Sequence, residues 1–88
     1  MRKTYVVIHA DTGPNIKAWL PDFPGFSVAG DRWTDTLTMV PLLLERHVEG
    51  MARRGEPLPE PTTPDLWVVH AEYPEALIGF VEVETGEG

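Results

Sequence analysis

The sequence contains no cysteine, so the fold has no disulfide bond and thiolate chemistry is excluded. No segment approaches the roughly 18–20 apolar residues that cross a bilayer. The apolar run after the N-terminus is also too brief for the core of a signal peptide. These absences are typical of a protein of the reducing cytoplasm, and we expect this protein to be cytoplasmic and not to associate with a membrane.

Basic residues are scarce. Seven Lys and Arg stand against fourteen Asp and Glu, which gives a formal net charge of −7. Affinity for nucleic acid depends largely on neutralising phosphates, so we expect no direct DNA binding. Complementary charge steers association, and a basic protein partner is one interpretation of the excess. The other is that the charge only keeps the protein soluble.

A chain of 88 residues forms a single domain, which we place at residues 1–83, followed by a disordered polar tail at 84–88. A domain of this size buries only about 60–65% of the surface that its unfolded chain exposes. Self-association would relieve that shortage of core, and we expect a homo-oligomer.

Three strands are predicted in the first third of the chain. Residues 3–10 are rich in β-branched and aromatic side chains, and turn-forming residues follow at 11–15. Residues 16–20 alternate, with Ile16, Ala18 and Leu20 on one face and Lys17 and Trp19 on the other. This spacing predicts an antiparallel hairpin with one buried face, extended by a short third strand at 26–29 into a meander.

A stiff turn, which we call the proline turn, separates the second and third strands. Its residues are Pro21, Asp22, Phe23, Pro24 and Gly25. The two prolines donate no backbone hydrogen bond and end the strand pairing. Asp22 is expected to accept from nearby backbone amides, and Gly25 permits a left-handed conformation.

A long amphipathic helix is predicted after Gly30-Asp31. Its apolar face is expected to consist of residues at spacings of three and four, and its end is set by Gly55. Pro41 interrupts the pattern, because proline inside a helix removes a hydrogen bond. A kink is favoured over two separate helices, since the spacing continues through Pro41 without a phase shift. The predicted apolar face comprises Trp33, Leu37, Val40, Leu44, Val48 and Met51.

The last third of the chain begins with a proline-rich connector at residues 56–64. Thr63-Pro64-Asp65 then supplies a helix cap, a proline and an acid, which favours a short helix at 64–71, although Leu66-Trp67-Val68-Val69 has the composition of a strand. Residues 76–83 form the last predicted strand. Its nearly continuous apolar run indicates burial on both faces, by the helix on one and by another subunit on the other.

No catalytic or metal-binding motif is present, and we expect no enzyme activity and no cofactor. His9, His47 and His70 lack the short spacing of metal ligands. The single serine, Ser27, does not lie in a nucleophile elbow. Isolated acids have ordinary roles in turns and at helix starts. Those acids are Asp11, Asp22, Asp31 and Asp35.

An exposed tryptophan can anchor a protein interface, because it buries a large area at little cost in entropy. Trp19 shares its strand face with Lys17, opposite the predicted core. We therefore predict a partner-binding set of Trp19, Lys17 and Phe80. Covering of Trp19 by the connector is the competing explanation.

Three stretches together resemble the HicB family of bacterial antitoxins. They are residues 5–8 with 18–31, residues 45–51 with 55–61, and Phe80-Val81-Glu82-Val83. They occur in the order and at the spacing of that family over residues 3–83. The resemblance implies an α+β fold that is a partial ribonuclease-H-like domain: a three-stranded antiparallel meander, a long helix, a connector and a final strand.

The resemblance also implies a function. Family members typically bind and neutralise HicA, a small basic toxin that degrades messenger RNA, and many carry a C-terminal DNA-binding domain. This sequence departs from the family pattern at Arg32, where a threonine cap is common, so Asp31 is expected to cap the helix. It departs again at Thr34-Asp35-Thr36 and at Pro41. We expect no DNA-binding module after the last strand.

The main hypothesis is therefore an antitoxin-like domain that binds a HicA-like toxin and occludes it. One alternative is a vestigial ribonuclease-H-like nuclease that uses magnesium, which needs converging carboxylates. The other is a self-associating orphan domain without a toxin.

Overall fold

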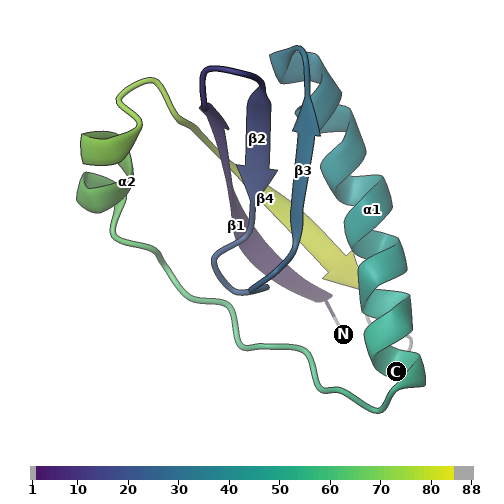
Figure 1. The fold of residues 1–88 in the computed structure, drawn as a ribbon. Coiled ribbons are helices and arrows are strands. Elements are labelled where there is room, and N and C mark those ends of the chain that lie inside the picture. The colour runs from purple at the N-terminus through teal and green to yellow at the C-terminus, as the bar shows by residue number, and fades with distance from the viewer. Residues whose placement is uncertain (1, 85–88) are drawn as a thin grey trace.

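The computed structural model describes residues 2–84. The chain forms β1 (Arg2–Asp11), β2 (Ile16–Trp19), β3 (Ser27–Gly30), α1 (Trp33–Arg53), α2 (Leu66–Glu72) and β4 (Leu77–Glu84). Figure 1 shows α1 and α2 on opposite sides of the sheet, with the long connector running below it from one helix to the other. The expected α+β class is confirmed.

The sheet has the strand order β3-β2-β1-β4, and every neighbouring pair is antiparallel. β1 and β2 form the predicted hairpin, in which Ile8 lies opposite Trp19 and Asp11 opposite Ile16. Gly13 turns the chain with a φ of 101°. β4 returns to the other side of β1, so the first and last strands of the chain lie side by side and β1 is central.

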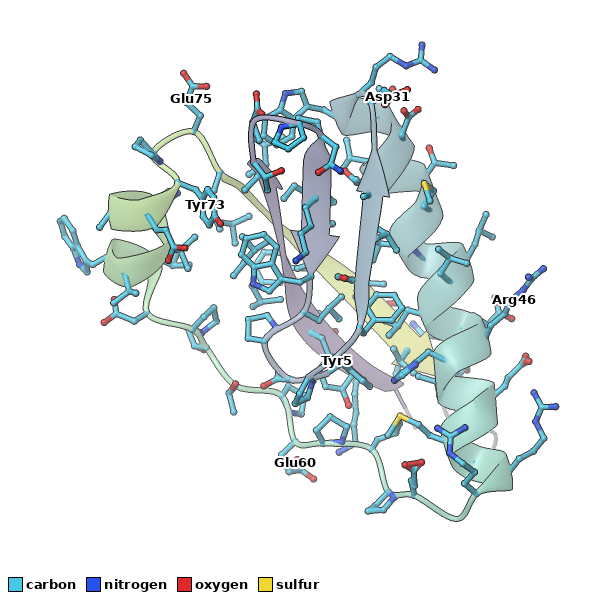
Figure 2. All side chains as sticks on the ribbon, in the orientation of Figure 1. Tyr5, Asp31, Arg46, Glu60, Tyr73 and Glu75 are labelled. Carbon is cyan, nitrogen blue, oxygen red and sulfur yellow. The ribbon has the colours of Figure 1, made fainter. Side chains whose placement is uncertain are left out.

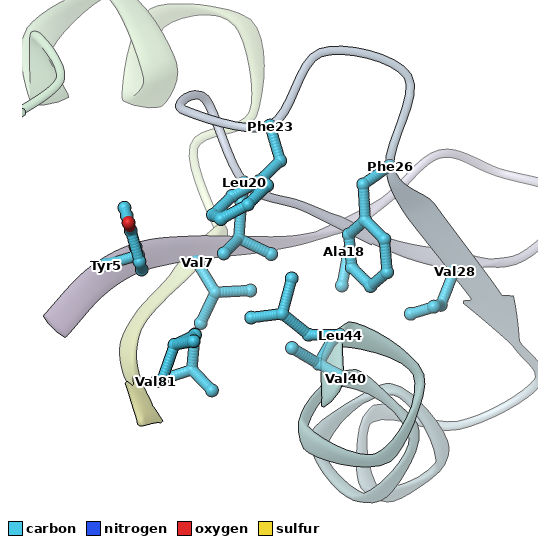
Figure 3. Packing of buried hydrophobic residues seen from close by; sticks show 11 residues of the cluster. Tyr5, Val7, Ala18, Leu20, Phe23, Phe26, Val28, Val40, Leu44 and Val81 are labelled. Atoms are coloured by element: carbon cyan, nitrogen blue, oxygen red, sulfur yellow. The ribbon is translucent and has the colours of Figure 1, made fainter. Parts of the chain in front are cut away.

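The hydrophobic core lies between the sheet and α1. Alternate residues of β1, starting with Tyr5 and Val7, point to this side, since successive side chains of a strand point to opposite faces. Val40 and Leu44 of α1 pack against them (Figure 3). The buried cluster comprises Tyr5, Val7, Ala18, Leu20, Phe23, Phe26, Val28, Val40, Leu44, Val81 and Val83.

α1 starts differently from the expectation. Its N-cap is Arg32, and the carboxylate of Asp35 accepts hydrogen bonds from the backbone amides of Arg32 and Asp31, both at 3.1 Å. Asp31 therefore does not cap the helix; the acid one turn inside it satisfies the free amides. These bonds and the Arg32 guanidinium lower the pKa of Asp35.

Pro41 lies inside one continuous helix, so the alternative of two separate helices is wrong. The predicted apolar face is correct at Val40 and Leu44 but wrong at Leu37, which is 50% exposed. Thr36 is buried in its place. The reason is tertiary: Thr36 meets His9 of β1, a polar pairing that an apolar pattern does not reveal.

The segment at 64–71 does contain a helix, but its cap is Asp65 rather than Thr63. The Asp65 carboxylate accepts from the amides of Trp67 and Val68. β4 extends through Glu84, which lies opposite Arg2, so the predicted tail begins one residue too early. The rest of that tail lies outside the described residues.

Candidate partner-binding surface

The three residues predicted to bind a partner lie on one face of the sheet. Ala10 lies opposite Lys17, Ile8 opposite Trp19, and Val6 opposite Phe80. Directly opposed residues share a face, and Val6, Ile8 and Ala10 alternate with the core-facing residues of β1. We call this the outer face; it is turned away from α1.

Trp19 is half-buried on the outer face. Its ring lies 5.6 Å from that of Tyr73, edge to face. Figure 2 shows Tyr73 between α2 and the sheet. Tyr73, the C-cap of α2, thus covers part of the indole of Trp19. The alternative that the connector covers Trp19 is therefore replaced by cover from the end of α2.

A groove of about 490 Å³ runs beside Trp19. Its walls are the proline turn, the outer side of β2 and β3, and the end of α2. Its polar lining comes from Lys17, Ser27 and Glu72. The groove is therefore lined by aromatic rings and by charges of both signs, and its size suits one inserted side chain of a protein partner.

Phe80 occupies the outer face of β4 and is 72% exposed. In the single chain β4 is therefore buried only on the side of α1, and the expected burial of its other face by another subunit stays a prediction. Val81 and Val83, which point to α1, are buried, whereas their outward neighbours are not. The apolar run of β4 is uninterrupted because its outward-facing positions include Phe80, which is exposed at the edge of the sheet.

Among the described residues, the most exposed large apolar side chain lies on α2, and it was not among the predicted partner-binding residues. Trp67 is 88% exposed, and Val68 and Leu66 are 61% and 39% exposed. None of the residues of α2 is buried. The signal was present in the sequence: a capped helix of seven residues with four consecutive apolar side chains cannot turn all of them to one core.

Charge is distributed unevenly around this apolar surface. Residues 55–84 contain no Lys or Arg. Figure 2 shows Glu60 and Glu75 on the side of the connector and α2, whereas Arg46 lies across the molecule on α1. The acids of this segment are Glu56, Glu60, Asp65, Glu72, Glu75, Glu82 and Glu84.

Three contacts, which we call the connector clasp, hold residues 56–65 against the sheet. The Tyr5 hydroxyl donates to the Pro59 carbonyl at 2.7 Å, and Lys3 pairs with Glu60 at 3.0 Å. The Asp22 carboxylate accepts from both the backbone amide and the hydroxyl of Thr62. Burial, with the charges of Asp22 and Glu60, raises the pKa of Tyr5 and keeps its phenol a neutral donor.

The clasp changes the role of Asp22. It was expected to accept from backbone amides near it in the sequence, but its hydrogen bonds reach Thr62, forty residues away. The turn itself is set by backbone bonds, from Phe23 to Leu20 and from Phe26 to Phe23, and by Gly25 with a φ of 87°. The proline turn is thus both a strand terminator and the anchor of the connector.

The histidines occupy separate places. His9 is buried, and its Nδ1 lies 2.9 Å from the Thr36 hydroxyl. That hydroxyl donates to the Trp33 carbonyl, so it accepts from a protonated Nδ1 of neutral His9. Burial lowers the pKa of His9. His47 packs against the rings of Phe23 and Phe26.

Three of the four acids considered for a magnesium site are engaged separately: Asp11 with the amide of Gly13, Asp22 with Thr62, and Asp35 with the start of α1. Within residues 2–84, no group of three metal-ligating His, Cys, Asp or Glu side chains is found. No helix in that range is long and apolar enough to cross a membrane.

A small antiparallel sheet with one long helix on its core side and an exposed apolar, acidic surface on the other defines the class of a small α+β domain. Comparison with known families is more specific: the model described as "HicB_like antitoxin of bacterial toxin-antitoxin system" matches residues 5–87. The chain belongs to this HicB-like antitoxin family.

A solved structure shows the same fold. It is described as "HicA3 and HicB3 toxin-antitoxin complex", and one of its chains aligns with a TM-score of 0.69 and 24% sequence identity. The alignment covers 93% of this chain and 99% of that one. No curated protein sequence matches this chain.

Proposed function

We propose that this protein is an antitoxin that binds a small basic toxin of the HicA type and neutralises it by covering the surface with which the toxin engages RNA. The observation that carries the proposal is the coincidence of exposed apolar groups with exclusively acidic charge over residues 55–84. Membership of the HicB-like family supports it.

The physical basis is that of a protein interface. Trp67 and Phe80 supply large apolar areas whose burial releases water, and tryptophan is among the residues that dominate binding energy. Glu72 and Glu75 lie near α2 and attract a basic partner before contact, which raises the association rate more than the final affinity. Neutralisation by coverage requires no reaction on the antitoxin side.

Calorimetry with the product of an adjacent small basic gene tests the proposal. Micromolar or tighter binding is expected, weakening as salt increases, together with rescue of growth when both proteins are expressed. Trp67→Ala is expected to weaken binding by tenfold or more. Leu42→Ala is the matched control, because Leu42 is 60% exposed but lies on α1. Absence of binding would contradict the proposal.

Charge reversal tests electrostatic steering. Glu72→Lys with Glu75→Lys is expected to slow association with a basic toxin, whereas Glu45→Lys with Glu49→Lys, the same change of net charge on the exposed side of α1, leaves the rate close to that of the wild type. Equal effects of the two changes would show that only net charge matters, and would remove α2 from the proposed surface.

A magnesium-dependent nuclease receives no support from the described residues, because three of the four candidate carboxylates are engaged in separate contacts and no group of three metal-ligating side chains is found among these residues. We further propose that the protein acts in the cytoplasm, where a messenger-RNA-degrading toxin acts, and that it self-associates. Self-association is supported by two exposed apolar side chains on the edge strand β4: Leu77 is 46% exposed and Phe80 is 72% exposed.

A further inference from the structure

β4 is an open edge of the sheet. It pairs with β1 over eight positions, from Arg2–Glu84 to His9–Leu77, and no strand within residues 2–84 pairs with its other side. Monomeric proteins usually protect such an edge with prolines, bulges or charges. β4 contains no proline, and its charged residues, Glu82 and Glu84, lie only towards its end.

We infer that a second copy of this chain adds to β4 in antiparallel orientation, about a two-fold axis centred on Phe80. This inference rests on the self-association proposed above, and it uses Phe80, which also belongs to the proposed toxin-binding surface. Two copies of β4 would then form one continuous sheet, because a C2 interface joins the same patch of each subunit.

The side chains of β4 are complementary to themselves in this register. Phe80 lies beside Phe80 of the second copy, and aromatic cross-strand pairs stabilise a sheet. The small Gly79 lies beside Val81, on the side of α1, so two bulky side chains do not meet at this pair. Leu77, 46% exposed in the single chain, lies beside the buried Val83.

Charge disfavours neighbouring registers. An axis at Glu82 places two carboxylates side by side, and like charges directly opposite each other destabilise a sheet. An axis at Val81 places Glu82 beside Phe80 and exposes the ring to a charge. The axis at Phe80 instead places Glu82 beside Ile78, where Arg2 of its own chain lies 3.8 Å from the Glu82 carboxylate.

The arrangement has a geometric consequence. Directly opposed residues share a face, so the axis is perpendicular to the sheet and both copies of α1 lie on one side of it. The two outer faces are then contiguous on the other side. A dimer built in this way presents two partner-binding surfaces in the same direction.

The absence of native cysteine makes a direct test possible. Phe80→Cys is expected to give a disulfide-linked dimer under mild oxidation, because Cβ atoms of opposed residues lie within about 4.5–5.5 Å, near the span of a disulfide. Ser27→Cys is the matched control, since Ser27 is exposed on the opposite edge strand β3. It is expected to remain monomeric on a denaturing gel.

Register is tested by mixing two variants, Ile78→Cys and Glu82→Cys, on the outer face of β4. Neither pairs with itself about an axis at Phe80, but each faces the other. A disulfide-linked species should therefore form in the mixture and at most weakly in either protein alone. Linking of Glu82→Cys with itself would overturn the register.

Light scattering on the wild-type protein separates the two levels of the proposal. A mass of two 9.8 kDa chains, reduced to one by Phe80→Glu, is the expected result. A monomeric wild type would overturn self-association and the β4 seam together. A dimer that persists in Phe80→Glu and is not linked by Phe80→Cys would overturn the seam alone. Toxin binding is tested separately with Trp67→Ala, because Trp67 lies on α2 and takes no part in the seam.

Discussion

Removal of the Asp22 carboxylate should release the connector while leaving the core intact. In Asp22→Ala, the two hydrogen bonds from Thr62 are lost, one of them from the backbone amide at 3.0 Å. Bonds to a charged acceptor contribute about 1.5–3 kcal/mol when buried. Solvent competes at this exposed site, so we expect about 1–2 kcal/mol for the pair.

The effect should be local. The connector is also held by the bond from Tyr5 to Pro59 and by the ion pair of Lys3 with Glu60, neither of which changes. A loss of about 1–2 kcal/mol makes the open form of the connector about 5- to 30-fold more populated. Amide hydrogen exchange at Thr62 should accelerate by that factor, whereas exchange in β1 should change little.

Asp11→Ala is the matched control, because Asp11 accepts only from the amide of Gly13 within its own turn. It should leave exchange at Thr62 unchanged. If Asp22→Ala also leaves the exchange of Thr62 unchanged, the clasp does not hold the connector and the reasoning is refuted. If both variants accelerate it equally, the effect reflects global stability.

Three further predictions concern the core and the helix. Because burial lowers the pKa of His9, the stability that neutral His9 contributes is fully present above its unfolded pKa of about 6.5 and is lost as the pH drops below that value. The melting temperature of His9→Gln should therefore fall less steeply at acidic pH than that of the wild type. Leu44→Ala should cost about 2–5 kcal/mol in urea unfolding, since Leu44 is 1% exposed in the core, and a smaller loss would indicate that α1 packs loosely. Gly30→Ala should destabilise the fold, because its new methyl group would lie 2.6 Å from the Cβ of Asp35. Gly50→Ala should instead stabilise α1 by up to about 1 kcal/mol, since only the flexible end of an arginine approaches that position. A higher melting temperature for Gly30→Ala, or a lower one for Gly50→Ala, would contradict this reasoning.

The strand positions were predictable because local patterns encode them. The alternation of Ile16, Ala18 and Leu20 with Lys17 and Trp19 predicted β2 and its two faces, whereas only the strand register places Phe80 on the face of Lys17 and Trp19. The helix at 66–72 followed from an acid and a proline before an apolar run. Each of these signals acts over a few residues, and the family motif joined them in order.

Contacts between distant segments were not predictable from those patterns. Thr36 was not expected inside α1, because its burial depends on the imidazole of His9 from another element. The link from Asp22 to Thr62 spans forty residues, and no local rule selects that acceptor. The exposure of Trp67 depends on where the connector places α2 relative to the sheet.

The sequence by itself determined the class of fold, the acidic charge and the absence of thiol chemistry, since composition and periodicity are properties of short windows of chain. The tertiary structure alone decided which apolar groups remain exposed and which edge of the sheet stays open. Burial is a property of the whole packing arrangement: the same apolar run that makes β4 a strand leaves Phe80 in solvent because no strand within residues 2–84 lies beyond it.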